Sequence, residues 1–324
     1  MNQYLDIELI QQHALIFLLK FLKEKNYRFT VITPLTHERI IMRKKSNASE
    51  LRTLKDIFGW NLPFYPEDLD IRLFDFLKRA HLIHLENNQW LSNIRVASLE
   101  DELFIHSAFP TLENDAVFFG PDTYRFYYHL KQYLQHQSQP LQRSVELCCG
   151  ASPVAIAIAK LFPTVCEVFT ADINPKALFY SQVNKKFVGL NNIYPTHSDL
   201  FSNLEGNFDL IFANPPYLMD SQERQYRHGG NHLDGTDLSL NILKEGIKRL
   251  SPCGHLFLYT GIAISHQGNR FLEAVQDWIS DYPTFQWSYE EIDPDVFGEE
   301  LEQPAYQHIE RIAIVLVKLV AVHS

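Results

Sequence analysis

Four consecutive residues, Asn214-Pro-Pro-Tyr217, have side-chain types that could hold a planar nitrogen group. The amide oxygen of Asn214 can accept a hydrogen bond, and the carbonyl groups of Pro215 and Pro216 offer further acceptors. The ring of Tyr217 provides an aromatic face on which a planar group can stack. The set suits an amide or an aryl amine, whose N–H hydrogens two acceptors could take. Asn-Pro-Pro also occurs in ordinary turns, so the motif alone leaves a purely structural role open.

The apolar run 208–213 places this motif. It is too short for a helix and is bounded by turn formers, which predicts a buried central strand. Pro215 and Pro216 cannot donate to a sheet ladder, so the strand ends with Asn214. Ligands bind at the carboxyl edge of open α/β sheets, and the strand therefore holds Asn214 where a substrate could reach it.

Three carboxylates are associated with the three predicted strands upstream. Glu146 could reach a cationic group from the first strand. Asp172 ends the second strand, 26 residues after Glu146, where an acidic residue can bind ribose hydroxyls. Asp199 follows the third strand and could accept from the amino group of adenine. Each carboxylate is ordinary alone, but together with Asn214 after the fourth strand they indicate a nucleoside-containing ligand.

The sequence of the turn that follows Glu146 disfavours two common classes of cofactor. It contains one glycine, Gly150, where a dinucleotide fingerprint needs three, and it has no Walker A lysine. Ser152 and Pro153 are favourable residues for the start of the next helix. The turn therefore disfavours a nicotinamide cofactor and a nucleoside triphosphate.

Residues 117–260 resemble the class I S-adenosylmethionine-dependent methyltransferases of the HemK/PrmB type, which are protein-glutamine N-methyltransferases. Asn214-Pro-Pro-Tyr217 matches the substrate-amide motif of that family residue by residue. The segments 119–123 and 229–235 resemble its cofactor-covering segment and the loop before its fourth helix. The resemblance implies S-adenosyl-L-methionine as cofactor and a catalytic role for Asn214, Pro215, Pro216 and Tyr217. The cofactor-binding residues it implies are Glu146, Cys148, Gly150, Asp172, Ile173, Asp199, Leu200, Asn214, Asp122 and Thr123. The chain departs from the family pattern at Cys148 and Ser152, where relatives usually carry glycines.

The elements that must position these residues alternate between strand and helix, which predicts a doubly wound α/β sheet of seven strands. With the resemblance, this is a Rossmann-like methyltransferase sheet in a domain spanning residues 111–324. The predicted strands are 144–148, 166–171, 192–195, 208–213, 255–260, 285–289 and 311–319, with the last antiparallel to its neighbours. The predicted helices are 153–162, 175–188, 238–250 and 269–281, after a helix that ends near residue 136.

Residues 1–110 are predicted to form a smaller α+β domain. Helices are expected at 6–25, 48–58 and 70–81, with short strands at 27–32 and 39–42. Two further strands, 82–86 and 89–96, face each other across Asn87-Asn88, a dipeptide typical of hairpin turns. This order resembles a winged helix. Because the segment carries 14 Lys+Arg against 14 Asp+Glu, support of the catalytic domain or protein recognition is favoured over nucleic-acid binding.

The charge and composition of the chain further limit its possible functions. Residues 111–324 carry the remaining 15 Lys+Arg and 25 Asp+Glu, which accounts for the whole net charge of −10. An acidic catalytic domain is unfavourable for a nucleic-acid partner, although it does not exclude one. The four cysteines show no metal-ligand spacing and predict no metal site, and a reducing cytoplasm is the simplest context. The sequence predicts no membrane span and leaves the oligomeric state open.

A protein side-chain amide is thus the favoured methyl acceptor. The alternatives are an exocyclic amino group of RNA or DNA, a small-molecule amine, and a non-catalytic scaffold on the same fold. The acidic segment 293–306, between the last two strands, is expected to overhang the active site and to favour substrates flanked by positive charge.

Overall fold

The structure is a computed structural model, and it describes residues 2–45, 51–137, 140–220 and 224–322, with side chains undescribed for residues 2–6 and 45. The chain divides into two compact units. The first unit comprises Met1–Tyr127, Gly150–Ala157 and Lys176–Asn191, and the second comprises Tyr128–Cys149, Ile158–Pro175 and Asn192–Ser324. The predicted boundary near residue 110 stays a prediction.

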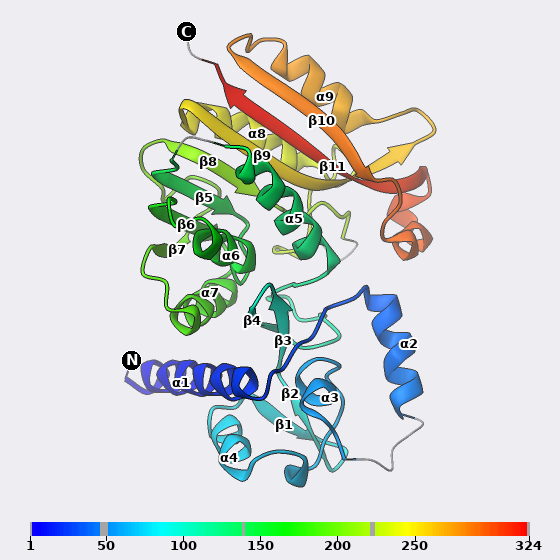
Figure 1. Cartoon of the computed structure of the whole chain (residues 1–324). Helices are drawn as coiled ribbons and strands as arrows, with labels where there is room; N and C mark the ends of the chain where they lie inside the picture. Colours follow the sequence, from blue (N-terminus) through cyan, green and yellow to red (C-terminus); the bar gives the residue numbers. More distant parts are fainter. Residues whose placement is uncertain (1, 46–50, 138–139, 221–223, 323–324) are drawn as a thin grey trace. The chain divides into compact units, whose positions relative to one another are not determined.

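The second unit contains a seven-stranded sheet, as predicted (Figure 1). Its strand order is β10-β11-β9-β8-β5-β6-β7, and β11 runs antiparallel to both of its neighbours while the other adjacent pairs are parallel. The fold class predicted from the alternating pattern is therefore confirmed. The strands are β5 Arg143–Leu147, β6 Glu167–Asp172, β7 Ile193–His197, β8 Phe208–Ala213, β9 Leu250–Ser265, β10 Phe285–Asp293 and β11 Ile309–Ala321.

Helices α8 (Asp237–Gly246) and α9 (Arg270–Ile279) pack on one face of this sheet through buried side chains such as Leu243 and Val275. Each large side chain buried in this way contributes roughly 1.5–3 kcal/mol to folding. Leu256 and Leu258 of β9 point into the same cluster, so Phe257 between them faces the other side of the sheet. There the ring of Tyr133 from α5 (Pro121–Gln135) lies 5.4 Å from Phe257. Most of the central strand β8 is apolar and buried, as expected of a strand in the parallel part of a sheet, and Asp209 is its one charged residue.

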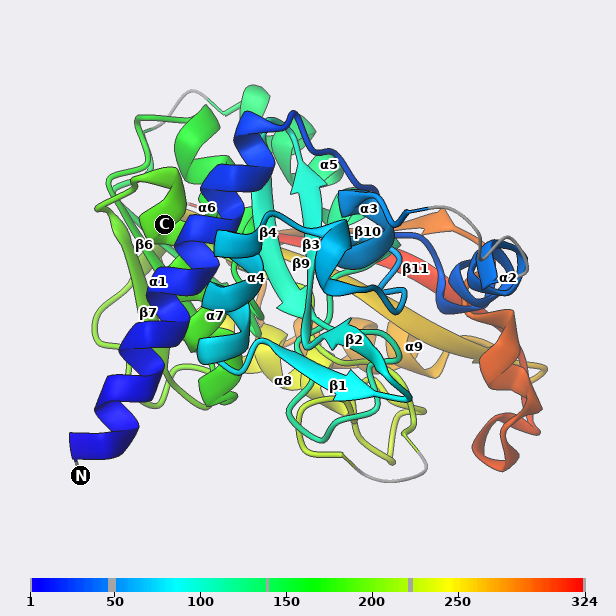
Figure 2. The ribbon, with the colours of Figure 1, turned by 90° about the horizontal axis from the view of Figure 1, so that it is seen from below.

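The first unit contains the N-terminal helices and two hairpins. Helices α1 (Asn2–Glu24) and α4 (Ile71–Arg79) lie side by side, with the rings of Phe17 and Phe76 5.6 Å apart (Figure 2). Strands β1 (Ile83–Glu86) and β2 (Gln89–Ser92) form the predicted hairpin, and Asn87 and Asn88 both have positive φ, as its turn requires. Strands β3 (Ile94–Leu99) and β4 (Glu102–Ser107) form a second hairpin. The helices are α1 Asn2–Glu24, α2 Pro34–Lys45, α3 Leu54–Phe58 and α4 Ile71–Arg79, with a short 3₁₀ turn at Pro66–Asp68.

Some of the secondary structure predicted for this unit differs from the structure. The predicted strand 39–42 is wrong, because it lies inside α2, which begins at Pro34 with proline in a favourable first position. A run of three or four apolar residues fits either periodicity, so the pattern alone did not separate a strand from a helix. Residues 27–33 form no strand, although Phe29 O accepts a hydrogen bond from Ser98 N. The predicted helix 48–58 is confirmed only at 54–58, and 46–50 lie outside the described residues.

Pieces from later in the chain join the first unit through a buried amide. Asn184 of α7 (Pro175–Val188) accepts from Ile105 N at 3.0 Å and donates to Ala151 O at 3.0 Å. These bonds link α7 to β4 and to the turn before α6 (Pro153–Leu161). No described helix has both the length and the apolar character needed to cross a bilayer.

Two buried histidines should make the stability of the first unit depend on pH. Burial, followed by the nearby charge of Arg95, lowers the pKa of His37 to about 4 and holds the pKa of His106 well below its usual range. Both imidazoles are neutral when folded and protonate near pH 6.5 when unfolded, so the unfolded chain takes up protons preferentially. Their contribution to stability is complete above about pH 6.5 and is lost as the pH falls toward the folded value.

Urea unfolding at pH 7.5, 6 and 5 measures this loss. His106→Leu should reduce the pH dependence, whereas replacing the exposed His13 with Gln should leave it unchanged. A stability that is equal at pH 7.5 and 5 would contradict the prediction.

Candidate active site

The register of the parallel strands brings the predicted site residues to one edge of the sheet. Leu147 of β5 is paired with Ala171 of β6 on one side and with Ala213 of β8 on the other. Cys148, Asp172 and Asn214 are the next residues of these strands. They therefore follow one another along the carboxyl edge, in the second unit.

The three carboxylates share an electrostatic environment around Cys148. Burial raises the pKa of the Cys148 thiol, and the charges of Asp172, Asp199 and Glu146 raise it further. The thiol is therefore neutral and a weak nucleophile. Glu146 is buried, Asp172 is half-buried and Asp199 is exposed. The carboxylates predicted to bind the cofactor thus lie close enough together to influence one common group.

Asp172 is held in place by its own turn. Its Oδ1 accepts from Asn174 N at 2.9 Å, and its backbone oxygen accepts from Ser198 N in the turn after β7 at 3.1 Å. Ile173, also predicted to bind the cofactor, lies within this turn, and its backbone oxygen bonds to the His197 ring at 3.1 Å. Leu200, beside Asp199, has a φ of 45°. Positive φ in a branched apolar residue is uncommon and marks a turn held by its surroundings.

The turn after β5 has a glycine-like backbone conformation at two positions that are not glycine. Cys148, Gly150 and Ser152 have φ values of 53°, 52° and 57°. For a non-glycine residue the left-handed conformation costs roughly 1–2 kcal/mol. Cys148 and Ser152 are the positions where the resembling family usually carries glycine, so the departure changes the side chains and retains the backbone shape. Cys149 N donates to Ala171 O at 3.1 Å, which ties the turn to β6.

Three of the predicted cofactor residues belong to the first unit. Asp122 is buried and forms an ion pair with Arg125 at 3.1 Å, and Thr123 Oγ1 accepts from Gly120 N at 3.3 Å. Gly150 lies beside Val117 and Phe118 of the same unit. The cofactor-binding role of Asp122, Thr123 and Gly150 stays a prediction.

Asn214 is half-buried, and its side chain forms no hydrogen bond with the part of the chain that the structure describes. Its amide oxygen is available to a ligand. Pro215 is buried and Pro216 is half-buried, so the segment after Asn214 is held by packing as well as by its rings. The role of Asn214 as an acceptor for a substrate N–H stays a prediction.

Tyr217 is packed among glycines. Its ring is adjacent to Gly261 of β9, where an added Cβ would fall 2.2 Å from Tyr217 Cε2. A Cβ at Gly235 would fall 2.2 Å from Tyr217 O, and one at Gly229 would fall 2.7 Å from Tyr217 Cα. Tyr217 is only 8% exposed. Its predicted use as a stacking surface for the substrate stays a prediction, whereas its packing role is evident.

The acidic segment 293–306 lies beside the motif. Phe297 and Tyr217 have ring centroids 6.2 Å apart, and the Tyr306 hydroxyl accepts from Met219 N at 2.8 Å. Glu300 is 4.0 Å from Arg227, and burial raises the pKa of its carboxyl. The contacts place this segment at the motif, as the strand order predicted, while selection of cationic substrates by its carboxylates stays a prediction.

Tyr306, Phe297 and Gly261 are residues of the site that the sequence did not identify. Gly261 lies in an ordinary strand, and the two aromatic residues lie far from the motif in the chain. The only signal was the position of 293–306 between the last two strands.

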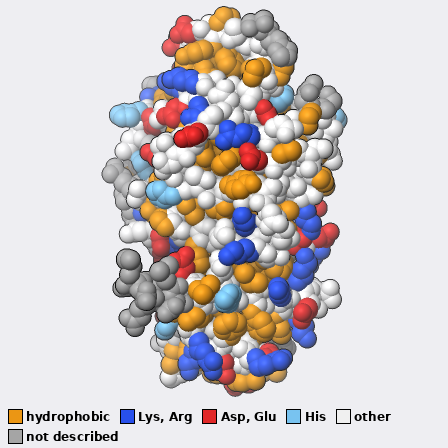
Figure 3. Space-filling view, turned by 90° about the vertical axis from the view of Figure 1, so that its left-hand side faces the viewer, with side chains coloured by type: hydrophobic (Ala, Val, Ile, Leu, Met, Phe, Trp, Pro, Cys, Tyr) orange, Lys and Arg blue, Asp and Glu red, His pale blue; other side chains and the backbone are white. Residues whose placement is uncertain are grey.

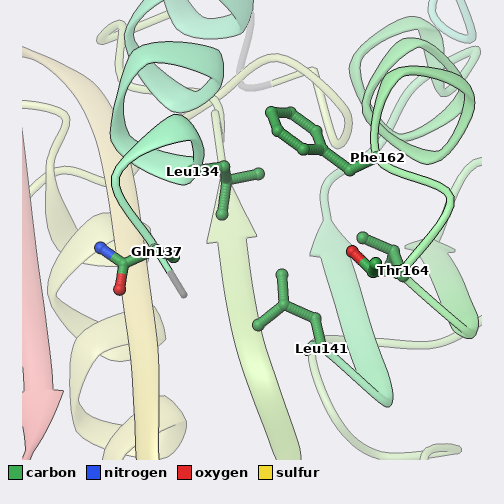
Figure 4. Close-up of a pocket in the computed structure, with 6 residues that line it drawn as sticks. Leu134, Gln137, Leu141, Phe162 and Thr164 are labelled. Atoms are coloured by element: carbon green, nitrogen blue, oxygen red, sulfur yellow. The ribbon is translucent and has the colours of Figure 1, made fainter. Parts of the chain in front are cut away.

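A small cavity lies away from this site (Figure 4). Leu141 precedes β5 and Val165 precedes β6, so the cavity is at the amino end of the strands, opposite to Asn214. Its volume of about 40 Å³ has room for a few water molecules and none for a nucleoside. Its lining residues are Leu134, Gln137, Leu141, Phe162, Thr164 and Val165.

Gly261→Ala should destabilise the second unit, because the new methyl group would overlap the Tyr217 ring. Overpacking of this kind costs roughly 1–3 kcal/mol. Gly298→Ala is the matched control, since a Cβ there would meet nothing within 4 Å. Urea unfolding of both variants measures the difference, and equal stabilities would show that Tyr217 shifts freely.

Known proteins are similar to the segment that contains this site. Residues 129–265 match the family described as Methyltransferase small domain. The ribosomal protein uL3 glutamine methyltransferase of Neisseria gonorrhoeae is 32% identical over 131 residues, which cover 37% of this chain and 44% of that protein. The protein of the same name from Xanthomonas campestris is 34% identical over 149 residues, covering 42% and 47%. The chain thus matches less than half the length of these relatives.

A solved structure shows the same fold. The crystal structure of Trm5b from Pyrococcus abyssi matches with a TM-score of 0.50 and 15% identity, covering 74% of this chain and 62% of that one. Sequence family, strand order and the Asn-Pro-Pro-Tyr motif agree. Residues 129–265 are therefore similar in sequence to the methyltransferase small-domain family and to these glutamine methyltransferases, on a fold shared with Trm5b.

Proposed function

We propose that this protein transfers the methyl group of S-adenosyl-L-methionine to the side-chain nitrogen of a protein glutamine. The observation that carries the proposal is the Asn214 amide, which lies at the carboxyl edge of the sheet and has no hydrogen-bond partner among the described residues. An open acceptor beside two prolines suits a nitrogen that carries two hydrogens.

The reaction requires positioning more than acid–base chemistry. The sulfonium group of the cofactor already activates the methyl group, so catalysis consists mainly of alignment and electrostatic stabilisation. An amide nitrogen is a poor nucleophile because its lone pair is delocalised. Hydrogen bonds from its N–H groups to Asn214 Oδ1 and to the Pro215 carbonyl would hold the nitrogen and favour localisation of the lone pair. Asp172 would hold the ribose and Asp199 the adenine of the cofactor.

The named relatives support a protein substrate. Both are ribosomal protein uL3 glutamine methyltransferases, and we extend that substrate class to this chain. A ribosomal-protein substrate agrees with the cytoplasmic location predicted from the cysteine content.

Methylation of an exocyclic amino group in a nucleic acid is the second candidate, because Asn-Pro-Pro-Tyr suits that nitrogen equally well. The net charge of −10 disfavours it, since nucleic-acid affinity comes largely from Lys and Arg at phosphates. On the face drawn in Figure 3, acidic and basic side chains are interspersed rather than gathered in a basic stripe. A small-molecule amine and a non-catalytic scaffold are the remaining alternatives.

Methyl transfer from labelled S-adenosylmethionine tests the proposal. The purified chain is incubated with fractionated cell extract and, separately, with purified ribosomal protein uL3. Label on a glutamine of a protein, located by mass spectrometry, is the expected result. Label in RNA, DNA or a small molecule would replace the substrate class. Cofactor binding without any transfer would favour the scaffold.

A further inference from the structure

We propose that Tyr306 is a positioning residue for the Asn-Pro-Pro-Tyr motif, and that Phe297 assists it from the same segment. This inference rests on the proposed function. Both residues lie beyond residue 265, outside the part of the chain that matches the methyltransferase family.

The backbone that follows the motif is anchored at successive groups. Leu218 O accepts from Gly229 N at 3.0 Å, and Asp220 N donates to the His228 ring at 3.2 Å. Between them, Met219 N donates to the Tyr306 hydroxyl at 2.8 Å. Two of these contacts come from the nearby segment 228–229, and the third comes from a side chain 87 residues further along the chain. The hydrogen bond to Tyr306 therefore connects the backbone after the motif to the C-terminal part of the second unit.

Burial makes this contact consequential. Tyr306 is 1% exposed and Met219 is 9% exposed, so water has little access to either partner. Burial raises the pKa of Tyr306 to about 12, and the hydroxyl stays protonated at neutral pH. A buried backbone N–H that loses its acceptor is costly to leave unpaired. If the hydroxyl is removed, we expect the backbone at Met219 to shift toward another acceptor for its N–H.

Phe297 supports the same segment from the side. Its φ of 54° and ψ of 40° lie in the left-handed region, which is a strained conformation for a bulky residue. The residue before it is fixed, because Val296 N donates to Ile312 O of β11 at 2.8 Å. The strained conformation brings the Phe297 ring to within 6.2 Å of the Tyr217 ring, measured between centroids. Strain that persists in a held loop is typical of functional segments.

A shift at Met219 would reach Asn214 through a stiff connection. The rings of Pro215 and Pro216 fix the φ angles of both residues. The chain between Asn214 and Met219 therefore has fewer soft dihedrals than an ordinary segment of that length. Asn214 must hold the substrate nitrogen in line with the transferred methyl group, and small misplacements reduce rates strongly. Tyr306 therefore acts on the reaction through Asn214 and touches neither the substrate nitrogen nor the cofactor.

Tyr306→Phe removes only the hydroxyl, and Tyr133→Phe is the matched control. The Tyr133 hydroxyl likewise has one hydrogen-bond contact in the second unit, at 2.7 Å from His255 Nδ1. The ring of Tyr133 packs on Phe257, so its contacts are not with the motif. Tyr306→Phe should lower kcat by roughly tenfold, with the affinity for S-adenosylmethionine unchanged. Tyr133→Phe should leave kcat close to that of the wild type.

Amide hydrogen exchange at Met219 gives a readout that does not depend on activity. Exchange should be faster in Tyr306→Phe and unchanged in Tyr133→Phe. Unaltered exchange at Met219 in Tyr306→Phe would overturn the hydrogen bond, and faster exchange with kcat within twofold of the wild type would overturn the positioning role. Absence of methyl transfer by the wild-type chain would instead count against the proposed function, and the exchange result would still decide whether Tyr306 holds Met219.

Discussion

Asn214→Ala is expected to reduce turnover by on the order of a hundredfold or more, while the affinity for S-adenosylmethionine stays near that of the wild type. The substitution removes an acceptor that acts on the substrate nitrogen as the methyl group is transferred. Because the Asn214 side chain has no hydrogen-bond partner among the described residues, its loss should disturb the fold little. Steady-state methyl transfer and calorimetric titration with the cofactor measure the two quantities.

Asn207→Ala is the control for this experiment. Asn207 immediately precedes β8 and Asn214 immediately follows it, so the two amides flank one strand at opposite edges of the sheet. Asn207 is exposed, and its replacement should leave turnover unchanged. Turnover of Asn214→Ala within a few-fold of the wild type would remove Asn214 from the mechanism.

Asp172→Asn should weaken the binding of S-adenosylmethionine by roughly tenfold to a hundredfold, the value of a hydrogen bond to a charged group. Asparagine is preferred to alanine here because Asp172 Oδ1 also accepts from Asn174 N at 2.9 Å. The amide oxygen of asparagine can retain that bond, so the turn survives while the charge and one acceptor for the ribose are lost. Calorimetry with the cofactor measures the affinity directly.

Asp277→Asn controls for the change in net charge, since Asp277 is an exposed residue of α9. Its cofactor affinity should equal that of the wild type. If Asp172→Asn also binds the cofactor with unchanged affinity, the ribose is held by another residue.

The sequence by itself determined the sheet and the location of its reactive edge. The run 208–213 that forms β8 is short, largely apolar and bounded by turn formers, which favours a strand over a helix. Pro215 and Pro216 then identify the end of β8 without any tertiary information, because neither can continue a ladder. The positions of Asp172 and Asn214 follow from these strand ends.

Local ambiguity limited the prediction in the first unit. The run 39–42 fits a strand and a helix equally well, and the structure places it inside α2. The hairpin of β3 and β4 depends on pairing between segments whose individual patterns do not specify a partner.

Only the tertiary structure decided how the motif is held. The hydrogen bond between Tyr306 and Met219 joins residues 87 positions apart, and no local propensity encodes such a contact. The glycine at 261 is explained by the Tyr217 ring beside it, which belongs to another segment. The left-handed backbone at Cys148 is likewise imposed by its surroundings, since cysteine does not favour that conformation. Strand ends are local properties of the chain, whereas the contacts that align a catalytic amide are properties of the packed sheet and its loops.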